Sequence, residues 1–157
     1  MIFRQLFDRE SSTYTYLLAE RTGGEAILID PVHEHTFQYL KLIGELDLKL
    51  VLAVDTHIHA DHVTALGELA AHSGALTAMG AQSRAECVSL KLGDGELIRA
   101  DGLTLRTLYT PGHTDDSCSF LLRDDGAEHV FTGDTLLIRG TGRTDFQNGD
   151  PGAQYDS

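Results

Sequence analysis

The chain has 157 residues, which is enough for one domain with a hydrophobic core and too few to expect two. Hydrophobic residues make up 41% of it, and no apolar run approaches the roughly 20 residues of a membrane span. Acidic residues outnumber basic ones by 24 to 12, and a net charge of −12 repels nucleic-acid phosphates. We therefore expect neither a membrane nor a nucleic acid as a partner. Because residues 1–5 lack the charged-then-apolar order of a signal peptide, we expect a cytoplasmic protein.

Three stretches early in the chain read as β-strands. Residues 13–19 and 25–30 are rich in aromatic and apolar side chains and are separated by a glycine turn. Residues 49–54 form a continuous apolar run, which is typical of a strand with both faces covered. The early strands therefore predict a buried sheet.

Helical patterns alternate with these strands. Residues 35–46 predict a helix whose apolar face carries Phe37, Leu40 and Ile43. A second helical pattern runs through Val63, Leu66 and Leu69.

The later half of the chain is mostly short strands. They are predicted at residues 97–100, 103–109, 117–122 and 129–132, most of them separated by Gly, Asp or Asn turns. Without repeats or Pro-rich linkers, residues 1–157 read as one continuous domain. Strands mixed with two helices, followed by strands alone, predict an α/β protein of layered sheets with helices outside.

Four potential metal ligands follow the apolar strand at residues 49–54. They are His57, His59, Asp61 and His62. The crevice beyond the carboxyl ends of strands is where layered α/β proteins bind ligands. Alternate residues of an extended loop point the same way, so His57 and His59 can face one point. We place Asp61 and His62 at the start of the next helix, where Asp61 can accept helix N–H bonds.

Two later loops repeat this arrangement. His113 lies in a Pro-Gly turn after the strand at residues 103–109, and Asp134 follows Gly133 after the strand at residues 129–132. Each is weak evidence alone, because such turns are common. Three strand-end loops that offer imidazole or carboxylate groups together predict a metal site.

These motifs resemble the metal signature of the metallo-β-lactamase superfamily, whose members have an αββα sandwich fold. The segment 133–147 is similar to glutathione persulfide dioxygenases, which oxidise the outer sulfur of glutathione persulfide to sulfite with O₂. Glyoxalase II, a related thioester hydrolase, shares the Gly-x-Gly-Arg core but lacks the Thr-Asp-Phe-Gln of residues 144–147. The resemblance therefore implies an iron-dependent persulfide dioxygenase.

The resemblance also implies roles for individual residues. It assigns one Fe(II) per chain to the catalytic ligands His57, His113 and Asp134. Two imidazoles and one carboxylate on one face of iron leave positions for persulfide and O₂. Residues that line the pocket or support the ligands are His59, Asp61 and His62. Arg143 matches an arginine that contacts glutathione, since a guanidinium suits a carboxylate.

The chain departs from the family in two places. Thr141 stands where the family usually has cysteine, and the chain ends at Ser157 although the family fold continues. We therefore expect the C-terminal part of the fold to be missing. The expected open sheet edge favours association, including a homo-oligomer. Two alternatives to the dioxygenase are a dinuclear zinc thioester hydrolase resembling glyoxalase II and a non-catalytic fragment of the fold.

Overall fold

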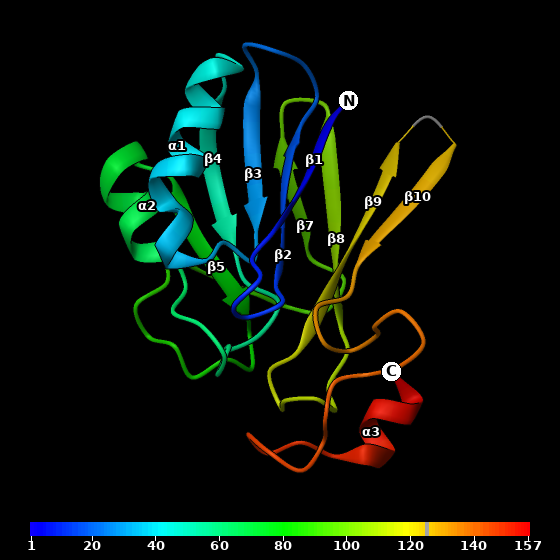
Figure 1. Ribbon diagram of the computed structural model, residues 1–157. Helices are drawn as coiled ribbons and strands as arrows, with labels where there is room; N and C mark the ends of the chain where they lie inside the picture. The colour runs from blue at the N-terminus through cyan, green and yellow to red at the C-terminus, as the bar shows by residue number, and fades with distance from the viewer. Residues whose placement is uncertain (125) are drawn as a thin grey trace.

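A computed structural model describes residues 1–124 and 126–157 and arranges their strands in two sheets (Figure 1). The first sheet contains β1 (Ile2–Phe7), β2 (Tyr14–Ala19), β3 (Glu25–Ile29), β4 (Lys49–Val54), β5 (Leu76–Gly80) and β6 (Leu90–Leu92), in that spatial order. The second contains β7 (Leu97–Ala100), β8 (Leu103–Tyr109), β9 (Cys118–Asp124) and β10 (Ala127–Phe131), ordered β10-β9-β8-β7. Strands β1 to β3 pair antiparallel, β3 to β6 pair parallel, and the second sheet is antiparallel throughout.

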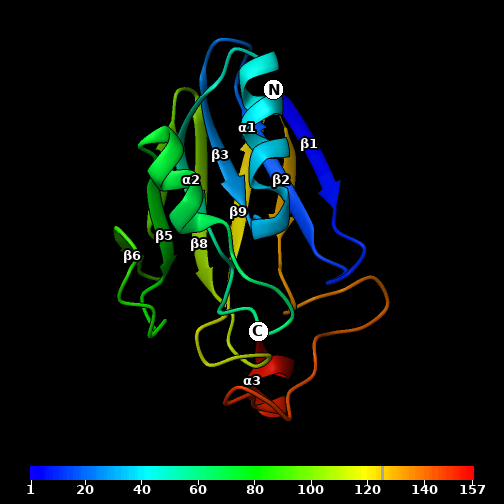
Figure 2. The same cartoon turned by 60° about the vertical axis from the view of Figure 1, so that its left-hand side comes forward.

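Two helices cover one face of the first sheet. The helix α1 (Thr36–Glu45), preceded by a 3₁₀ turn at His33–His35, joins β3 to β4, and α2 (Leu66–Ser73) joins β4 to β5. Parallel strands joined by crossovers of one hand place their helices on the same side, as Figures 1 and 2 show. The short helix α3 (Pro151–Asp156) lies apart from both, below the sheets in Figure 2. No helix of the described residues is long and apolar enough to span a membrane.

Two apolar layers result, one on each face of the first sheet. The layer between the sheets includes Leu18, Ile27, Leu52, Leu105, Phe120 and Leu122. The layer under the helices includes Leu17, Leu28, Tyr39, Ala53, Leu66 and Leu69. Strand β4 contributes to both layers, which explains its continuous apolar sequence and confirms the expectation of a covered strand.

The predicted helices are present, and Ile43, Leu66 and Leu69 are buried as expected, but Phe37 is not. In α1, Phe37 is 69% exposed whereas Tyr39 is 3% exposed. Tyr39 can be buried because its hydroxyl contacts Thr15 Oγ1 at 3.1 Å and accepts a bond from the Val32 N–H. The helix α2 begins only at Leu66, so the positions just before it belong to a loop. The strands β1, β5 and β6 and the helix α3 were not predicted.

The carboxyl ends of β3, β4, β8 and β10 lie at the same end of the molecule, at the bottom of Figure 1. The loops that leave these ends carry Asp30, His57, His113 and Asp134 respectively. The fold therefore places every predicted metal ligand where the carboxyl ends of strands from both sheets meet.

Candidate metal centre

The ends of three strands bring His57, His113 and Asp134 together. Their candidate ligand atoms all lie within 4.8 Å of one another. The two imidazole rings are nearly perpendicular, at 89°, with centroids 4.9 Å apart, and His113 Nε2 lies 3.3 Å from Asp134 Oδ2. A first-row metal with bonds of about 2.1 Å holds its donors about 3–4 Å apart. The cluster therefore has the dimensions of a metal site.

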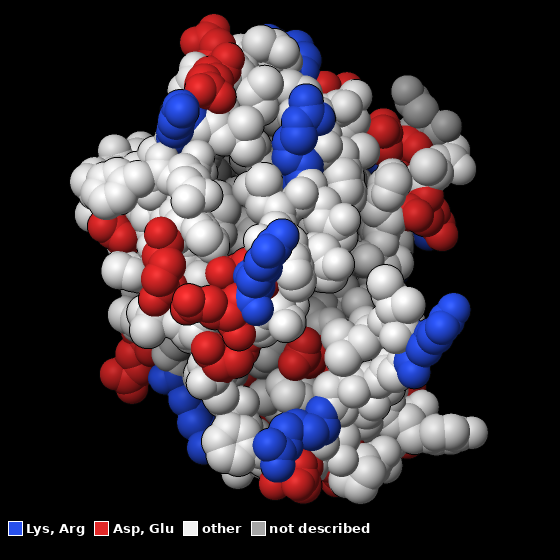
Figure 3. All heavy atoms as spheres, in the orientation of Figure 1, with Lys and Arg blue, Asp and Glu red and all other residues white. Residues whose placement is uncertain are grey.

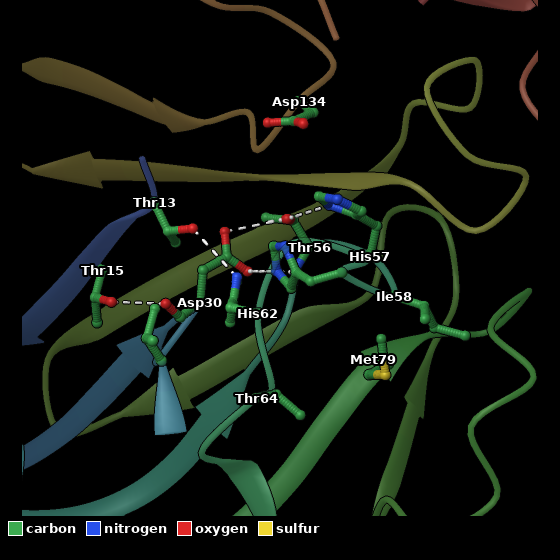
Figure 4. A network of polar contacts seen from close by, with 12 residues as sticks. Thr13, Thr15, Asp30, Thr56, His57, Ile58, His62, Thr64, Met79 and Asp134 are labelled. Atoms are coloured by element: carbon green, nitrogen blue, oxygen red, sulfur yellow. Dashed lines mark hydrogen bonds and ion pairs between the residues drawn. The ribbon is translucent and has the colours of Figure 1, made fainter. Parts of the chain in front are cut away.

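His57 is buried and is held through the threonine that precedes it (Figure 4). Thr56 Oγ1 donates to Asp30 Oδ2 at 3.1 Å and lies 3.0 Å from His57 Nδ1. Because the hydroxyl proton goes to the carboxylate, the hydroxyl oxygen accepts the Nδ1 proton of His57. The Thr56 N–H also donates to Asp30 Oδ1 at 2.7 Å, which fixes the carboxylate. This arrangement keeps the proton on Nδ1 and leaves Nε2 for a metal.

His113 is held by the backbone of the loop that follows Asp134. Its Nδ1 donates to the Arg143 carbonyl at 2.7 Å. The loop comes this close because Gly142 has no side chain: a Cβ there would lie 2.6 Å from His113 Nδ1. His113 therefore also keeps its proton on Nδ1 and directs Nε2 toward Asp134.

The Asp134 loop passes directly over Thr56. Gly133 has a φ of 48°, in the left-handed region that favours glycine. A side chain at Gly133 would collide with the Thr56 hydroxyl. The Gly-Asp motif thus brings the Asp134 carboxylate down onto the two imidazoles.

The charge state of His57 also suits a metal ligand. Burial, followed by the positive charge of His59, lowers the pKa of His57 to about 3. His57 is therefore neutral at neutral pH, with a lone pair on Nε2. Metals bind the neutral form of imidazole, so no proton has to be displaced from Nε2.

His59 belongs to a second group, and its environment is different. Its Nε2 lies 3.2 Å from Asp30 Oδ1. Burial works to lower its pKa, but the hydrogen bond and charge of Asp30, then the charges of Asp55 and Asp61, raise it to about 9. His59 is therefore a buried imidazolium paired with a carboxylate.

Asp61 and His62 complete this second group, whose candidate ligand atoms also lie within 4.8 Å of one another. His62 Nδ1 lies 3.3 Å from Asp61 Oδ2 and 3.2 Å from the Thr13 hydroxyl. The predicted helix cap is wrong, because α2 starts at Leu66 and Asp61 is too far from its first N–H groups. Asp61 instead contacts side chains of its own loop and of the β1–β2 loop.

Two buried carboxylates that the sequence analysis missed connect the loops. Asp30 joins the β3 end to Thr56 and His59. Asp116 accepts bonds from the Ile58 N–H at 3.2 Å and the Thr114 hydroxyl at 2.7 Å. Asp30 could have been found, because it ends an apolar strand whose carboxyl end meets that of the strand before His57. No comparable pattern distinguishes Asp116.

A cavity of about 460 Å³ opens beside the candidate centre. We call it the first cavity; it is lined by residues that include Tyr14, Asp30, His59, Asp61, Asp134 and Leu136. Its lining thus contains three carboxylates, and exposed Leu136 and Ile138 add apolar surface. Acidic side chains also gather beside and below α2 on the face shown in Figure 3.

The side chain of Arg143 lies outside the lining of the first cavity. It donates to both carboxylate oxygens of Asp145, at 2.7 and 3.0 Å, and its guanidinium lies 5.7 Å from the Phe146 ring centroid. Its exposed position leaves the guanidinium free to exchange Asp145 for another carboxylate.

Comparison with known proteins places this geometry in a family. The model of the metallo-beta-lactamase superfamily matches residues 8–157. The chain is 44% identical over its full length to the mitochondrial persulfide dioxygenase ETHE1 of Mus musculus, of which it covers 61%. A crystal structure of ETHE1 from Myxococcus xanthus superposes with a TM-score of 0.92 at 51% identity, covering 99% of this chain and 67% of that one.

Hydrolases are among the relatives as well. The hydroxyacylglutathione hydrolase of Francisella tularensis is 31% identical over 99% of this chain, which covers 60% of the hydrolase. The chain thus spans less than two thirds of the length of the curated relatives it matches. The fold, the matching family model and the predicted resemblance to persulfide dioxygenases agree: the chain belongs to the metallo-β-lactamase superfamily.

Proposed function

We propose that the chain carries the iron centre of a persulfide dioxygenase that acts on glutathione persulfide. The observation that carries the proposal is the donor set of the candidate centre, which consists of two imidazoles and a carboxylate supplied by three different loops. This set suits non-haem Fe(II) that keeps open positions. The reaction is balanced as glutathione persulfide + O₂ + H₂O → glutathione + sulfite + 2 H⁺. The sulfur–sulfur bond breaks, the outer sulfur is oxidised and O₂ is reduced.

The residues of the site fit a single metal ion. His57, His113 and Asp134 would hold it, and the two imidazoles are fixed by hydrogen bonds that do not involve a metal. Iron, when bound, would supply the point at which persulfide sulfur and O₂ react. The hydrogen bonds to Thr56 and the Arg143 carbonyl orient the two imidazoles beforehand, so binding requires little reorganisation.

Arg143 is proposed to bind a carboxylate of the glutathione part of the substrate. Its planar guanidinium already holds Asp145 through two parallel bonds, which is the geometry that a substrate carboxylate would adopt. The substrate would replace Asp145, and the Arg143 carbonyl would continue to hold His113. The side chain and the backbone of Arg143 therefore have separate proposed roles.

A dinuclear zinc thioester hydrolase is the second candidate. It is favoured by the compact second group of His59, Asp61 and His62 and by the similarity to hydroxyacylglutathione hydrolase. Against it, the His59 Nε2 is engaged by Asp30 and the imidazole is charged. A second metal would have to displace that proton and compete with that bond.

Oxygen consumption with glutathione persulfide tests the proposal, together with metal analysis of the same sample. The dioxygenase predicts one iron per chain and O₂ uptake matched by sulfite formation. Two zinc ions per chain with thioester hydrolysis would support the hydrolase. Absence of both activities in the iron-loaded and zinc-loaded chain would support the non-catalytic fragment. The compartment stays a prediction; the Mus musculus relative is a mitochondrial protein by name.

A further inference from the structure

A second cavity lies on the other side of the loop that carries His57 and His59. Its volume is about 240 Å³, and it opens between α2, β5 and the segment 81–89. The residues that define it here are Ile58, His59, Leu66, Met79, Ala85 and Val88. In Figure 4, Ile58 and Met79 lie on the far side of this loop from Asp134.

The walls of the two cavities differ in chemistry. The second cavity is mainly aliphatic, with the Met79 thioether among its walls. The first cavity has three carboxylates in its lining, from Asp30, Asp61 and Asp134. A small apolar molecule therefore partitions into the second cavity more favourably than into the first.

Among the described residues, His59 alone lines both cavities, so its imidazole separates them. Its ring centroid lies 4.1 Å from that of His57, a proposed metal ligand. A molecule in the second cavity therefore lies one imidazole away from the candidate centre. If the substrate occupies the first cavity, which opens beside the candidate centre, a molecule in the second cavity lies outside the substrate's space.

Asp55 and His62 form a polar part of the second cavity's lining. Within the described part of the chain, Asp55 Oδ1 and His62 Nε2 are buried without a hydrogen-bond partner. Water can satisfy such atoms at a roomy polar site. An aliphatic region remains beyond them, and apolar cavities of about 150 Å³ are known to stay dry and to bind xenon.

We infer that the second cavity is the binding and entry site for the dioxygen used at the candidate centre. This inference rests on the proposed function. Dioxygen is small and apolar, whereas a persulfide of glutathione is anionic and fills most of a cavity the size of the first. Separate routes let O₂ reach the centre when the persulfide already blocks the first cavity.

The first test is xenon binding, which requires no activity. Xenon is an apolar probe with a size similar to that of O₂, and a crystal of the chain under xenon pressure should show it against Ile58 and Met79. Ala85→Phe should fill the cavity and remove the xenon. Val88→Phe serves as a second filling variant in case the first folds poorly. Ala81→Phe, at an exposed position in the same segment, is the matched control.

The second test is the KM for O₂ at saturating glutathione persulfide. Ala85→Phe should raise it by roughly three- to tenfold while the KM for the persulfide stays within about twofold. Ala81→Phe should change neither constant. Xenon absent from the second cavity, or an unchanged KM for O₂ in both filling variants, overturns the inference. If the parent chain consumes no O₂, the proposed function fails, and the xenon experiment alone decides whether the cavity binds an apolar gas.

Discussion

The loop after β4 supplies residues to two groups of similar composition and different behaviour. His57, with His113 and Asp134, forms a group in which each imidazole is bonded at Nδ1 and presents Nε2 to the others. His59, with Asp61 and His62, forms a group that is engaged with its own surroundings. Both groups have ligand atoms within 4.8 Å. Proximity alone therefore does not distinguish them.

The difference comes from where the carboxylates lie. Asp30 bonds His59 directly but reaches His57 only through the Thr56 hydroxyl. Direct contact makes His59 an imidazolium with a pKa of about 9, whereas burial keeps His57 neutral with a pKa of about 3. Asp30 favours the charged form of both histidines, but at His57 burial and the charge of His59 outweigh it, so the two histidines take opposite charge states. We propose that only the first group is prepared for a metal.

Removing His113 should have the largest effect on this comparison. His113→Ala deletes one of three proposed ligands and should weaken iron binding by more than about a hundredfold. The matched variant His62→Ala should keep iron affinity within about tenfold. Both are measured by metal analysis after dialysis against a weak chelator. Stoichiometric iron in His113→Ala would contradict the assignment, and equal loss in both variants would favour a dinuclear site.

Removing Asp30 should have the next largest effect, on folding stability. Asp30→Ala leaves the buried His59 imidazolium without its hydrogen-bond partner, with Asp61 3.8 Å away, and removes the acceptor for Thr56. Breaking a buried ion pair from one side costs about 3–5 kcal/mol in the free energy of unfolding. Denaturant unfolding of the metal-free chain measures it. Asp30→Asn should cost less, because the amide oxygen can still accept the Thr56 N–H bond. Equal losses in the two variants would show that the Thr56 N–H bond contributes little and that the cost comes from the lost charge.

The sequence predicted the ligand loops because each follows an apolar strand, and because two contain a glycine turn and the third a cluster of ligand-type residues. It also predicted β4 with correct bounds, since a run covered on both faces has a clear pattern. It could not predict which group pairs with Asp30, because that contact joins residues far apart in the chain. The start of α2 was missed for a related reason: Val63 fits the helical spacing but is 63% exposed in a loop. The spacing of apolar residues alone does not show at which residue the loop ends and the helix begins.

Arg143 is proposed to bind the substrate and not the metal, so its removal should affect substrate binding alone. Arg143→Ala should raise the KM for glutathione persulfide and leave iron content unchanged, because the backbone carbonyl that holds His113 remains. Losing a charge-assisted contact with the substrate should lower kcat/KM by about ten- to a hundredfold. Arg139→Ala, an exposed arginine of the same loop, is the control. Unchanged kinetics in Arg143→Ala would assign the guanidinium to its Asp145 pair alone.

The smallest effect is expected at a carboxylate–imidazole pair outside both groups, Asp8 with His35. Bonds from the Ser11 hydroxyl and N–H, then from His35, hold the pKa of Asp8 well below its usual range. A lowered native pKa means that the stabilisation is present above the unfolded value of about 4 and is lost as pH falls toward the native value. Asp8→Asn should therefore reduce stability by about 1 kcal/mol at pH 7, since the site is near the surface. Denaturant unfolding of both proteins at several pH values should show a constant difference from pH 8 to 5 that shrinks below pH 4. A difference that persists unchanged at pH 3 would mean that the Asp8 charge contributes little and that the amide simply fits the Ser11 turn less well.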